Sequence, residues 1–278
     1  MNKKDLLDKI QALYEESVNK SANPAWRVKK PEHFIYVPEK RVMELKTYIK
    51  EIFNVIGVKK FNKTLDMGAG RGELCFALAE FSDEVIGLEP DSFSSKIAEL
   101  LKEYFETKNV DFIAGIGEKL PFKDNDFDLV VSTSTLEHMP DWKESLKEIH
   151  RVLKNNGIFF LNVPNYFWFR EPHYELPMLP LMPKFILRIF AYFTGRNPQY
   201  INHIQYLTPR RLEKELKENG FEIRNITEEQ IKKSLVERGG SRRKIVVWLK
   251  KLKLNRIAAA FFIKTKAYPH IILISKKN

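Results

Sequence analysis

The order of hydrophobic and polar residues changes character near residue 60. Before that point, apolar residues recur at helical spacing, with breaks at Asn23-Pro24 and near Pro38, and predict an N-terminal helical region over residues 1–60. After it, short apolar runs alternate with amphipathic segments of helical length. This alternation predicts an α/β fold, with a parallel sheet and helices on both of its faces.

Two insertions interrupt the alternation, one rich in aromatic residues and proline, the other rich in Lys and Arg. We therefore expect four parts: residues 1–60, a core over 61–164, an insertion over 165–207, and a C-terminal part of the core over 208–278 that carries the basic insertion 231–266. Strands are expected at 64–67, 85–88, 110–114, 128–132, 158–163, 222–226 and 270–275, and helices at 73–81, 94–104, 142–153 and 208–219. Asn155-Asn156-Gly157 is typical of a helix end and should stop the helix over 142–153.

The net charge of +11 is confined to one end of the chain. Residues 228–278 hold 14 Lys and Arg against three Asp and Glu, and the remainder is neutral. Such a segment predicts an anionic partner for itself and not for the whole protein. The single cysteine, Cys75, excludes a disulfide framework and a cysteine-rich zinc site. A polar start and the absence of a membrane-spanning apolar run predict a cytoplasmic protein.

A glycine-rich turn follows the first expected strand, in the sequence Asp66-Met67-Gly68-Ala69-Gly70-Arg71-Gly72-Glu73. Glycines let the backbone turn tightly and approach a ligand closely. The dinucleotide-binding pattern G-x-G-x-x-G would need its third glycine where Glu73 stands, but that glycine comes one residue early. The spacing disfavours a nicotinamide-dependent oxidoreductase, which stays open as an alternative class.

With an acidic residue before G-x-G-x-G, this turn resembles motif I of the class I S-adenosylmethionine-dependent methyltransferases. Further segments follow in the order of that family: Ile86–Asp91, Glu118–Phe122 with Phe127–Val131, Leu136-Glu137-His138 and Arg151–Gly157. The resemblance implies S-adenosyl-L-methionine as the cofactor. It also implies a Rossmann-like sheet of seven mostly parallel strands with the last strand antiparallel, and a cofactor-binding role for residues 61–164.

The resemblance also assigns cofactor-binding positions residue by residue. They are Asp66, Gly68, Ala69, Gly70, Glu89, Pro90, Gly117, Glu118, Thr133 and Leu136. The glycine turn is expected at the methionine part of the cofactor, Glu89 at the ribose hydroxyls, and Gly117 and Glu118 at the adenine. The family's acidic residue opposite the adenine amine falls at Ile116 here, so Glu118, backbone groups or apolar packing must replace it.

His138 is the candidate general base, because it follows the fourth expected strand and should lie beside the transferable methyl group. An orienting or packing role is the alternative. The segment Leu136-Glu137-His138 is also similar to the ubiquinone-biosynthesis O-methyltransferases, where a further acidic residue plus Glu-His is associated with a divalent metal. That further position is Ser134 here, so we predict no metal site.

The acceptor is expected to be a hydroxyl. An [N/D]-P-P-[Y/F] tetrad, which serves amino groups, is absent after the fourth strand, where Ser132–Thr135 stands. The 165–207 insertion leaves the carboxyl end of a central strand and can form a lid over the acceptor. Its candidate substrate-binding residues are Trp168, His173, Glu175, His203 and Tyr206. Its many apolar residues are typical of an acceptor pocket and equally of a lid packed on its own domain.

Residues 241–263 of the basic insertion mix Lys and Arg with apolar residues and Trp248, which predicts a basic amphipathic helix. Such a helix suits an anionic membrane surface; the alternative is a helix hairpin packed on the sheet edge with a solvated basic face. RNA binding is a third alternative, without a recognised RNA module.

Together the patterns predict methylation of a hydroxyl on an apolar or lipid-linked small molecule, such as a quinone, an isoprenoid or a lipid-carried sugar. The protein is expected in the cytoplasm, peripheral to the inner membrane surface if residues 241–263 bind lipid. Two alternatives stay open: a cofactor-binding protein without turnover, and C- or N-methylation of a soluble metabolite. The sequence specifies neither the acceptor nor the oligomeric state.

Overall fold

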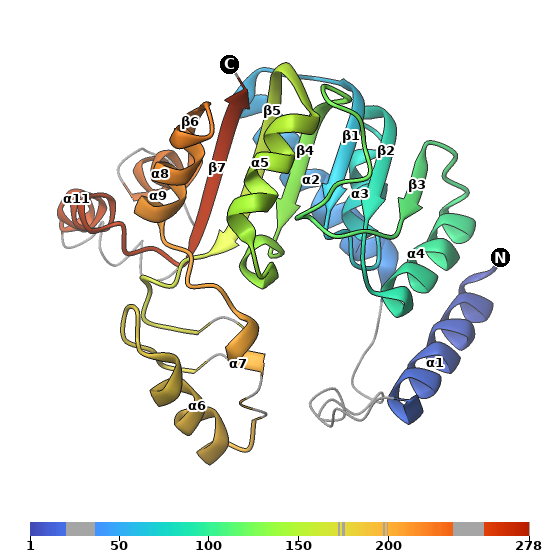
Figure 1. Ribbon diagram of the computed structural model, residues 1–278, viewed down its shortest axis with the longest axis horizontal. Helices are drawn as coiled ribbons and strands as arrows, with labels where there is room; N and C mark the ends of the chain where they lie inside the picture. The colour runs from blue at the N-terminus through green and yellow to red at the C-terminus, as the bar shows by residue number, and fades with distance from the viewer. Residues whose placement is uncertain are drawn as a thin grey trace. The chain divides into compact units, whose positions relative to one another are not determined.

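The computed structural model describes residues 1–20, 37–171, 173, 176–196, 198, 200–235 and 253–277. Its sheet has seven strands in the order β3-β2-β1-β4-β5-β7-β6 (Figure 1). The strands are β1 (Phe61–Met67), β2 (Ser82–Leu88), β3 (Val110–Ile113), β4 (Phe127–Thr133), β5 (Leu153–Pro164), β6 (Phe221–Asn225) and β7 (His270–Lys277). Because β1 pairs in parallel with β2 and β4, β2 pairs in parallel with β3, and β7 is antiparallel to its two neighbours, the predicted fold class is confirmed.

The helices begin and end where local chemistry favours it. They are α1 (Lys3–Lys20), α2 (Pro38–Ile56), α3 (Glu73–Leu78), α4 (Ser92–Phe105), α5 (Trp142–Val152), α6 (Lys184–Phe193), α7 (Tyr200–His203), α8 (Pro209–Glu218), α9 (Ile226–Leu235) and α11 (Asn255–Thr265), with a 3-10 turn η3 (Leu136–His138). Pro38 opens α2, where its fixed φ suits the first turn, and Gly57 closes it with φ 74°. The predicted break near Pro38 is thus a helix start, whereas the break at Asn23-Pro24 lies outside the described residues.

The described residues form two compact units. The first contains Met1–Ser132 and Lys147–Gly157, and the second contains Thr133–Leu146 and Ile158–Asn278. In the first unit, α3 packs on β1 and β2, α2 packs on α3, and α1 packs on α4. In the second unit, α8 packs on β6, α9 packs on β7, and α11 packs on α9. The boundaries expected at residues 60, 164 and 207 stay predictions.

The predicted helix over 142–153 is confirmed within one residue, but Asn155-Asn156-Gly157 does not form its stop. α5 ends at Val152, and the three residues lie within β5. The carbonyl oxygens of Arg151 and Val152 accept hydrogen bonds from the backbone N–H groups of Asn125 (3.0 Å) and Asp126 (2.8 Å). These bonds satisfy the last carbonyls of the helix from another segment, so the chain can leave α5 directly into a strand.

One continuous helix through residues 241–263 is excluded, whereas the alternative of a helix hairpin stays a prediction. Residues 241–252 lie outside the described residues, but Lys253 has a positive φ of 59° and α11 begins only at Asn255. A non-glycine residue in the left-handed region interrupts the α-helical hydrogen-bonding pattern. The described end of the basic insertion is therefore a separate helix, in which Arg256 and Lys264 are the basic residues.

The 165–207 insertion has a hydrophobic core of its own. Tyr166 and Met178 are buried in it together with residues of α6 and α7, and Tyr206 packs against its edge. Leu179 and Leu181, in contrast, are 66% and 47% exposed. The apolar composition of this insertion is thus used partly for its own packing, as one of the two sequence interpretations expected.

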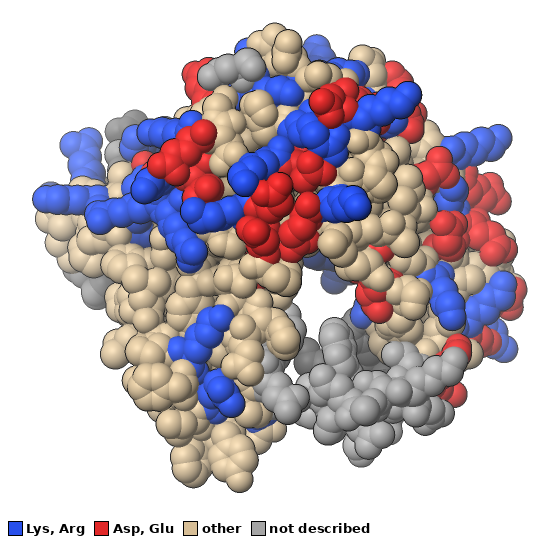
Figure 2. All heavy atoms as spheres, in the orientation of Figure 1, with Lys and Arg blue, Asp and Glu red and all other residues tan. Residues whose placement is uncertain are grey.

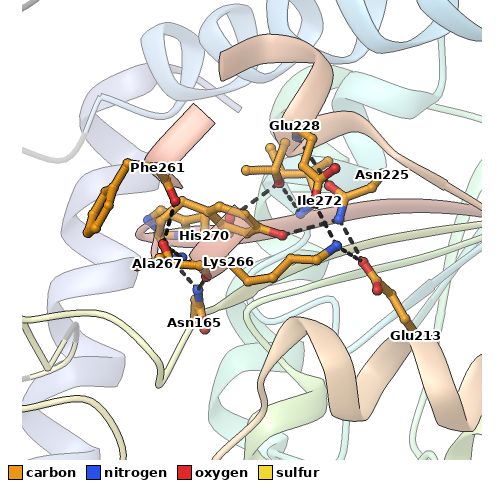
Figure 3. A network of polar contacts seen from close by, with 12 residues as sticks. Asn165, Glu213, Asn225, Glu228, Phe261, Lys266, Ala267, His270 and Ile272 are labelled. Atoms are coloured by element: carbon orange, nitrogen blue, oxygen red, sulfur yellow. Dashed lines mark hydrogen bonds and ion pairs between the residues drawn. The ribbon is translucent and has the colours of Figure 1, made fainter. Parts of the chain in front are cut away.

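A polar network around Lys266 joins α8, α9 and the segment after β5 in the second unit (Figure 3). The Lys266 ammonium group donates to Glu228 on α9 (2.6 Å) and to Glu213 on α8 (2.9 Å). Asn165, after β5, donates to the backbone carbonyls of Lys266 (2.9 Å) and Tyr268 (2.7 Å). Burial opposes the charge on Lys266, yet the hydrogen bonds to the two carboxylates leave its pKa above the usual value.

Replacing Lys266 by Met should lower the free energy of unfolding by about 1–3 kcal/mol, because Glu213 and Glu228 would lose a charged partner while only 23% and 19% exposed. Urea denaturation measures this change. The matched control is Lys214→Met, which breaks an exposed pair with Glu218 and should cost less than about 0.5 kcal/mol. Equal losses in the two variants would contradict the role given to the network.

Candidate functional site

The carboxyl ends of β1, β2 and β3 lie side by side at one edge of the sheet. The register pairs Met67 with Leu88, and Leu88 with Ile113. The glycine turn continues this alignment, because the N–H groups of Gly68 (2.8 Å) and Ala69 (3.0 Å) donate to the carbonyl of Leu88. Chain segments that leave these strands therefore emerge together, as in nucleotide-binding sheets of this topology.

The three glycines of the turn have different tasks. Gly68, Gly70 and Gly72 all have positive φ, between 55° and 82°. A Cβ atom on Gly72 would lie 2.5 Å from the Phe112 ring, so this glycine is required by packing. A Cβ atom on Gly70 would meet no described atom within 4 Å. Gly70 thus borders open space, as a residue that faces a ligand should.

Glu89 follows β2 and is held against the glycine turn. Its carboxylate accepts hydrogen bonds from the N–H of Gly70 (2.9 Å) and the N–H of Asp91 (2.9 Å). Asp91 in turn caps α4 by accepting from the N–H of Ser94 (2.9 Å). Pro90 lies between them. These bonds bring two of the predicted cofactor-binding segments together and orient an acceptor group for ligand hydroxyls.

Asp66 lies beneath the turn, 2% exposed, with Cys75 beside it. The thiol of Cys75 donates to the Asp66 carboxylate at 3.3 Å. Burial raises the pKa of Asp66 to about 7, and the charges of Glu89 and Glu73 act in the same direction. The sequence analysis missed this contact, since the two residues are nine positions apart on different elements and no sequence pattern signals it.

The segment predicted at the adenine follows β3. Gly117 is buried and Glu118 is half-buried, whereas Ile116 is 51% exposed. Arg151 holds the continuation of this segment by donating to the carbonyls of Leu120 (3.0 Å) and Phe122 (2.8 Å). An exposed isoleucine at the position of the family's acidic residue is compatible with apolar packing on a base. The assignment of Gly117 and Glu118 stays a prediction.

Thr133 and Leu136 belong to the second unit. The Thr133 hydroxyl ends β4 as a buried group with no hydrogen-bond partner among the described residues. Leu136 is fully buried at the start of η3. The Leu136 side chain is therefore inaccessible to a ligand in this conformation. The residue can contribute only its backbone groups or a structural role.

His138 lies in a polar cluster with His173 of the insertion. The Nε2 atoms of the two rings are 3.2 Å apart, and Nδ1 of His173 lies 2.7 Å from the buried carboxylate of Glu171. Nε2 of His138 is 3.9 Å from the Glu137 carboxylate. Burial, followed by the charge of His173, lowers the pKa of His138 to about 4. His138 is therefore neutral near pH 7.

Two tyrosines border this cluster. The rings of Tyr166 and Tyr206 stack with centroids 4.8 Å apart, and the Tyr166 hydroxyl is 3.3 Å from Nδ1 of His173. The Tyr206 hydroxyl is buried and has no hydrogen-bond partner in the described part of the chain. Burial and then the charge of Glu171 raise the pKa of Tyr206 to about 12. Three of the predicted site residues, His138, His173 and Tyr206, thus belong to one neighbourhood.

The other predicted substrate-binding residues lie elsewhere in the described structure or outside the described residues. Trp168 is half-buried and its ring packs against Phe169 and Phe262. His203 is exposed at the end of α7. Glu175 lies outside the described residues. The sequence offered no means of separating His173 from His203, since both lie in the same insertion.

Comparison with known families and proteins gives a consistent result. Residues 65–161 match the family model of a methyltransferase domain. The demethylmenaquinone methyltransferase of Staphylococcus aureus is 31% identical over 170 residues, which cover 59% of this chain and 67% of that protein.

Two solved structures show the same fold. The YcgJ protein from Bacillus subtilis has a TM-score of 0.53 and 17% identity, and the match covers 82% of this chain and 97% of that chain. The [4+2]-cyclase SpnF has a TM-score of 0.52 and 17% identity, with coverage of 84% and 80%.

The pKa of Asp66 predicts a pH dependence of stability in the ligand-free protein. Its folded value, about 7, lies above the ordinary value of 3.8, so the folded state keeps a proton that the unfolded state releases. The stability that this retained proton contributes is fully present below pH 4 and is lost as the pH rises through 7. Between pH 5 and 7.5 the free energy of unfolding of the wild-type protein should fall by about 2–3 kcal/mol more than that of Asp66→Asn, at about 1.4 kcal/mol per pKa unit.

Urea denaturation at the two pH values measures this difference. Asp83→Asn is the control, since the Asp83 side chain is 57% exposed and pairs with Lys60 at the surface. Identical pH profiles for the wild-type protein and Asp66→Asn would show that Asp66 is ionised throughout.

Proposed function

The chain belongs to the class I S-adenosylmethionine-dependent methyltransferases, and on that premise we propose that it methylates a hydroxyl oxygen of an apolar or lipid-linked small molecule. The observation that carries the proposal is the pair of imidazoles, His138 and His173, on the turn after β4 and on the insertion. The name of the demethylmenaquinone methyltransferase relative supports a quinone-type acceptor. The acceptor pocket is expected within the 165–207 insertion.

The chemistry needs little beyond positioning and the removal of one proton. S-adenosyl-L-methionine, when bound, would supply an activated methyl group through cleavage of its sulfur–methyl bond, with S-adenosylhomocysteine as the leaving group. The acceptor oxygen must be aligned with that group, which Tyr206 and the insertion would do, and its proton must leave as the new oxygen–carbon bond forms. The neutral His138 ring is the proposed proton acceptor. Its contact with His173, and that of His173 with Glu171, gives the proton a hydrogen-bonded route away from the acceptor.

A second candidate function is cofactor binding without methyl transfer. It is favoured by one observation, the likeness of the fold to a [4+2]-cyclase, since one fold can support unrelated reactions. Methylation of carbon, or of nitrogen in a soluble metabolite, also stays an alternative. Identification of the methylated product separates these cases.

The exposed face of α6 is apolar, which supports an acceptor that resides in a membrane. Phe185, Ile189 and Phe193 recur every four residues along this helix and are 63%, 52% and 81% exposed. The helix contains Lys184 and Arg188 and no acidic residue. Figure 2 shows the surface over α6 as mostly uncharged, with isolated basic side chains. Such a face suits the boundary of an anionic bilayer.

No bilayer-spanning segment is needed for this. Within the described residues, every helix is too short or too polar to cross a membrane. We therefore propose peripheral contact through α6, in addition to the contact predicted for residues 241–263, of which 241–252 lie outside the described residues.

Incubation with methyl-labelled S-adenosylmethionine and cell extract should place the label in the organic phase, on a methoxy group identified by mass spectrometry. His138→Ala should lower the rate of transfer by about 10²-fold or more, because the proton acceptor is removed, while cofactor affinity changes little. Asn202→Ala, which changes an exposed residue of α7 in the same insertion, is the control and should keep the wild-type rate. Label confined to the aqueous phase would reject the apolar acceptor, and unchanged transfer by His138→Ala would reject the base.

Membrane contact is tested by cosedimentation with vesicles of phosphatidylglycerol and phosphatidylcholine. The double variant Phe185→Ser/Phe193→Ser should bind at least about 10-fold more weakly, because it removes two exposed aromatic groups from the lipid-facing side. Met43→Ser is the control, since Met43 is similarly exposed, at 63%, but lies on α2. Equal vesicle binding by all three proteins would contradict a membrane role for α6.

A further inference from the structure

Three metal-ligating side chains of the second unit converge at one point. Glu137 and His138 come from η3, and His173 comes from the 165–207 insertion, 35 residues later in the chain. One ligand atom of each residue lies within 4.8 Å of the corresponding atoms of the other two. The sequence prediction of no metal considered only the neighbourhood of Ser134, where the expected acidic ligand is missing.

The separations fit a small transition-metal ion. Bonds of 2.0–2.1 Å in a tetrahedral zinc site place neighbouring ligand atoms about 3.3–3.5 Å apart. The Nε2 atoms of His138 and His173 are 3.2 Å apart, and Nε2 of His138 is 3.9 Å from the Glu137 carboxylate. All three ligand atoms lie within 4.8 Å of one another, so side-chain shifts on the order of 1 Å would bring them to bonding distance around one ion.

Glu137 is the observation that points to a ligand independently of the histidines. Its side chain has no exposed surface, and neither carboxylate oxygen has a hydrogen-bond partner among the described residues. A buried carboxylate without hydrogen bonds is costly, since it has lost its water and gained nothing. An ion between Glu137 and the two imidazoles would provide the missing interaction.

Glu171 prepares His173 for this role. Its buried carboxylate lies 2.7 Å from Nδ1 of His173, which places the proton of the neutral ring on Nδ1. The lone pair of Nε2 then points toward His138. Histidines that bind metal typically have their other ring nitrogen held by a carboxylate in this way.

We propose that Glu137, His138 and His173 bind one divalent transition-metal ion, with Zn²⁺ the best match. Two imidazoles and one carboxylate are the ligand set of zinc sites that keep a fourth position open. Mg²⁺ and Ca²⁺ are disfavoured because they prefer oxygen ligands. The insertion thus supplies a ligand that no motif of the family predicts.

This inference goes beyond the proposed methyl transfer and alters one part of it. With the ion in place, Nε2 of His138 is a ligand and no longer accepts a proton directly. A hydroxyl bound at the open fourth position loses its proton more readily, since a bound cation lowers the pKa of a coordinated oxygen. The ion also joins the insertion to η3.

Isothermal titration calorimetry of the tag-free, chelator-treated full chain with ZnCl₂ tests the site without cofactor or acceptor. One equivalent should bind with a dissociation constant in the micromolar range or below. His173→Ala should weaken binding at least about 100-fold, and Glu171→Gln about 10- to 100-fold. His203→Ala, which removes an exposed histidine of the same insertion, should bind like the wild-type protein.

Two further measurements keep the proposal testable if His173→Ala does not fold. Glu137→Gln keeps the size of the side chain, so it should fold and still bind zinc much more weakly. Titration with Co²⁺ should give the visible absorption of a tetrahedral site in the wild-type protein and not in Glu137→Gln. Absence of saturable zinc binding to the wild-type protein would overturn the proposal and leave the histidines as a hydrogen-bonded pair. Zinc binding by His173→Ala and Glu137→Gln as tight as that of the wild-type protein would overturn it as well. Methyl transfer is measured separately: zinc binding leaves the proposed transfer standing but removes His138 as its direct proton acceptor, and absence of zinc binding leaves both standing.

Discussion

The parallel register of β1 with β2 and β4 is the constraint on which the rest of the structure depends. It aligns Asp66 with Gly87 on one side and with Val131 on the other. Because parallel strands end at the same edge, the glycine turn and the Glu89 segment are brought together at the carboxyl ends of β1 and β2. In the second unit, β7 is antiparallel to both β5 and β6, so β5 and β6 end on the same side, where β7 begins.

Buried carboxyl groups mark positions that lower the stability of the folded protein. Asp66 in the first unit and Glu137 in the second are both more than 95% buried, and burial raises the pKa of each to about 7. Apolar residues at these positions would pack without that penalty. Positions that oppose folding in this way are typical of binding and catalytic sites. Each unit thus carries a separate indication of function.

Much of the fold could be predicted from sequence because local patterns determine it. Alternating apolar runs located the strands within a few residues, and the glycine turn located the first strand–helix junction. The inclusion of Asn155-Asn156-Gly157 in β5 could not be predicted, because backbone groups of Asn125 and Asp126 satisfy the last carbonyls of α5. The pairing of His138 with His173 was equally inaccessible, since it depends on the path of an insertion that no repeating pattern describes.

The position of Cys75 has a practical consequence. It is the sole cysteine of the sequence, it is fully buried on α3, and burial next to Asp66 raises its pKa. A thiol in this state is inert toward alkylating reagents until α3 separates from β1. The rate at which such a reagent modifies the native protein therefore reports how often this part of the first unit opens. The sequence contains its own probe of local unfolding, placed directly beneath the glycine turn.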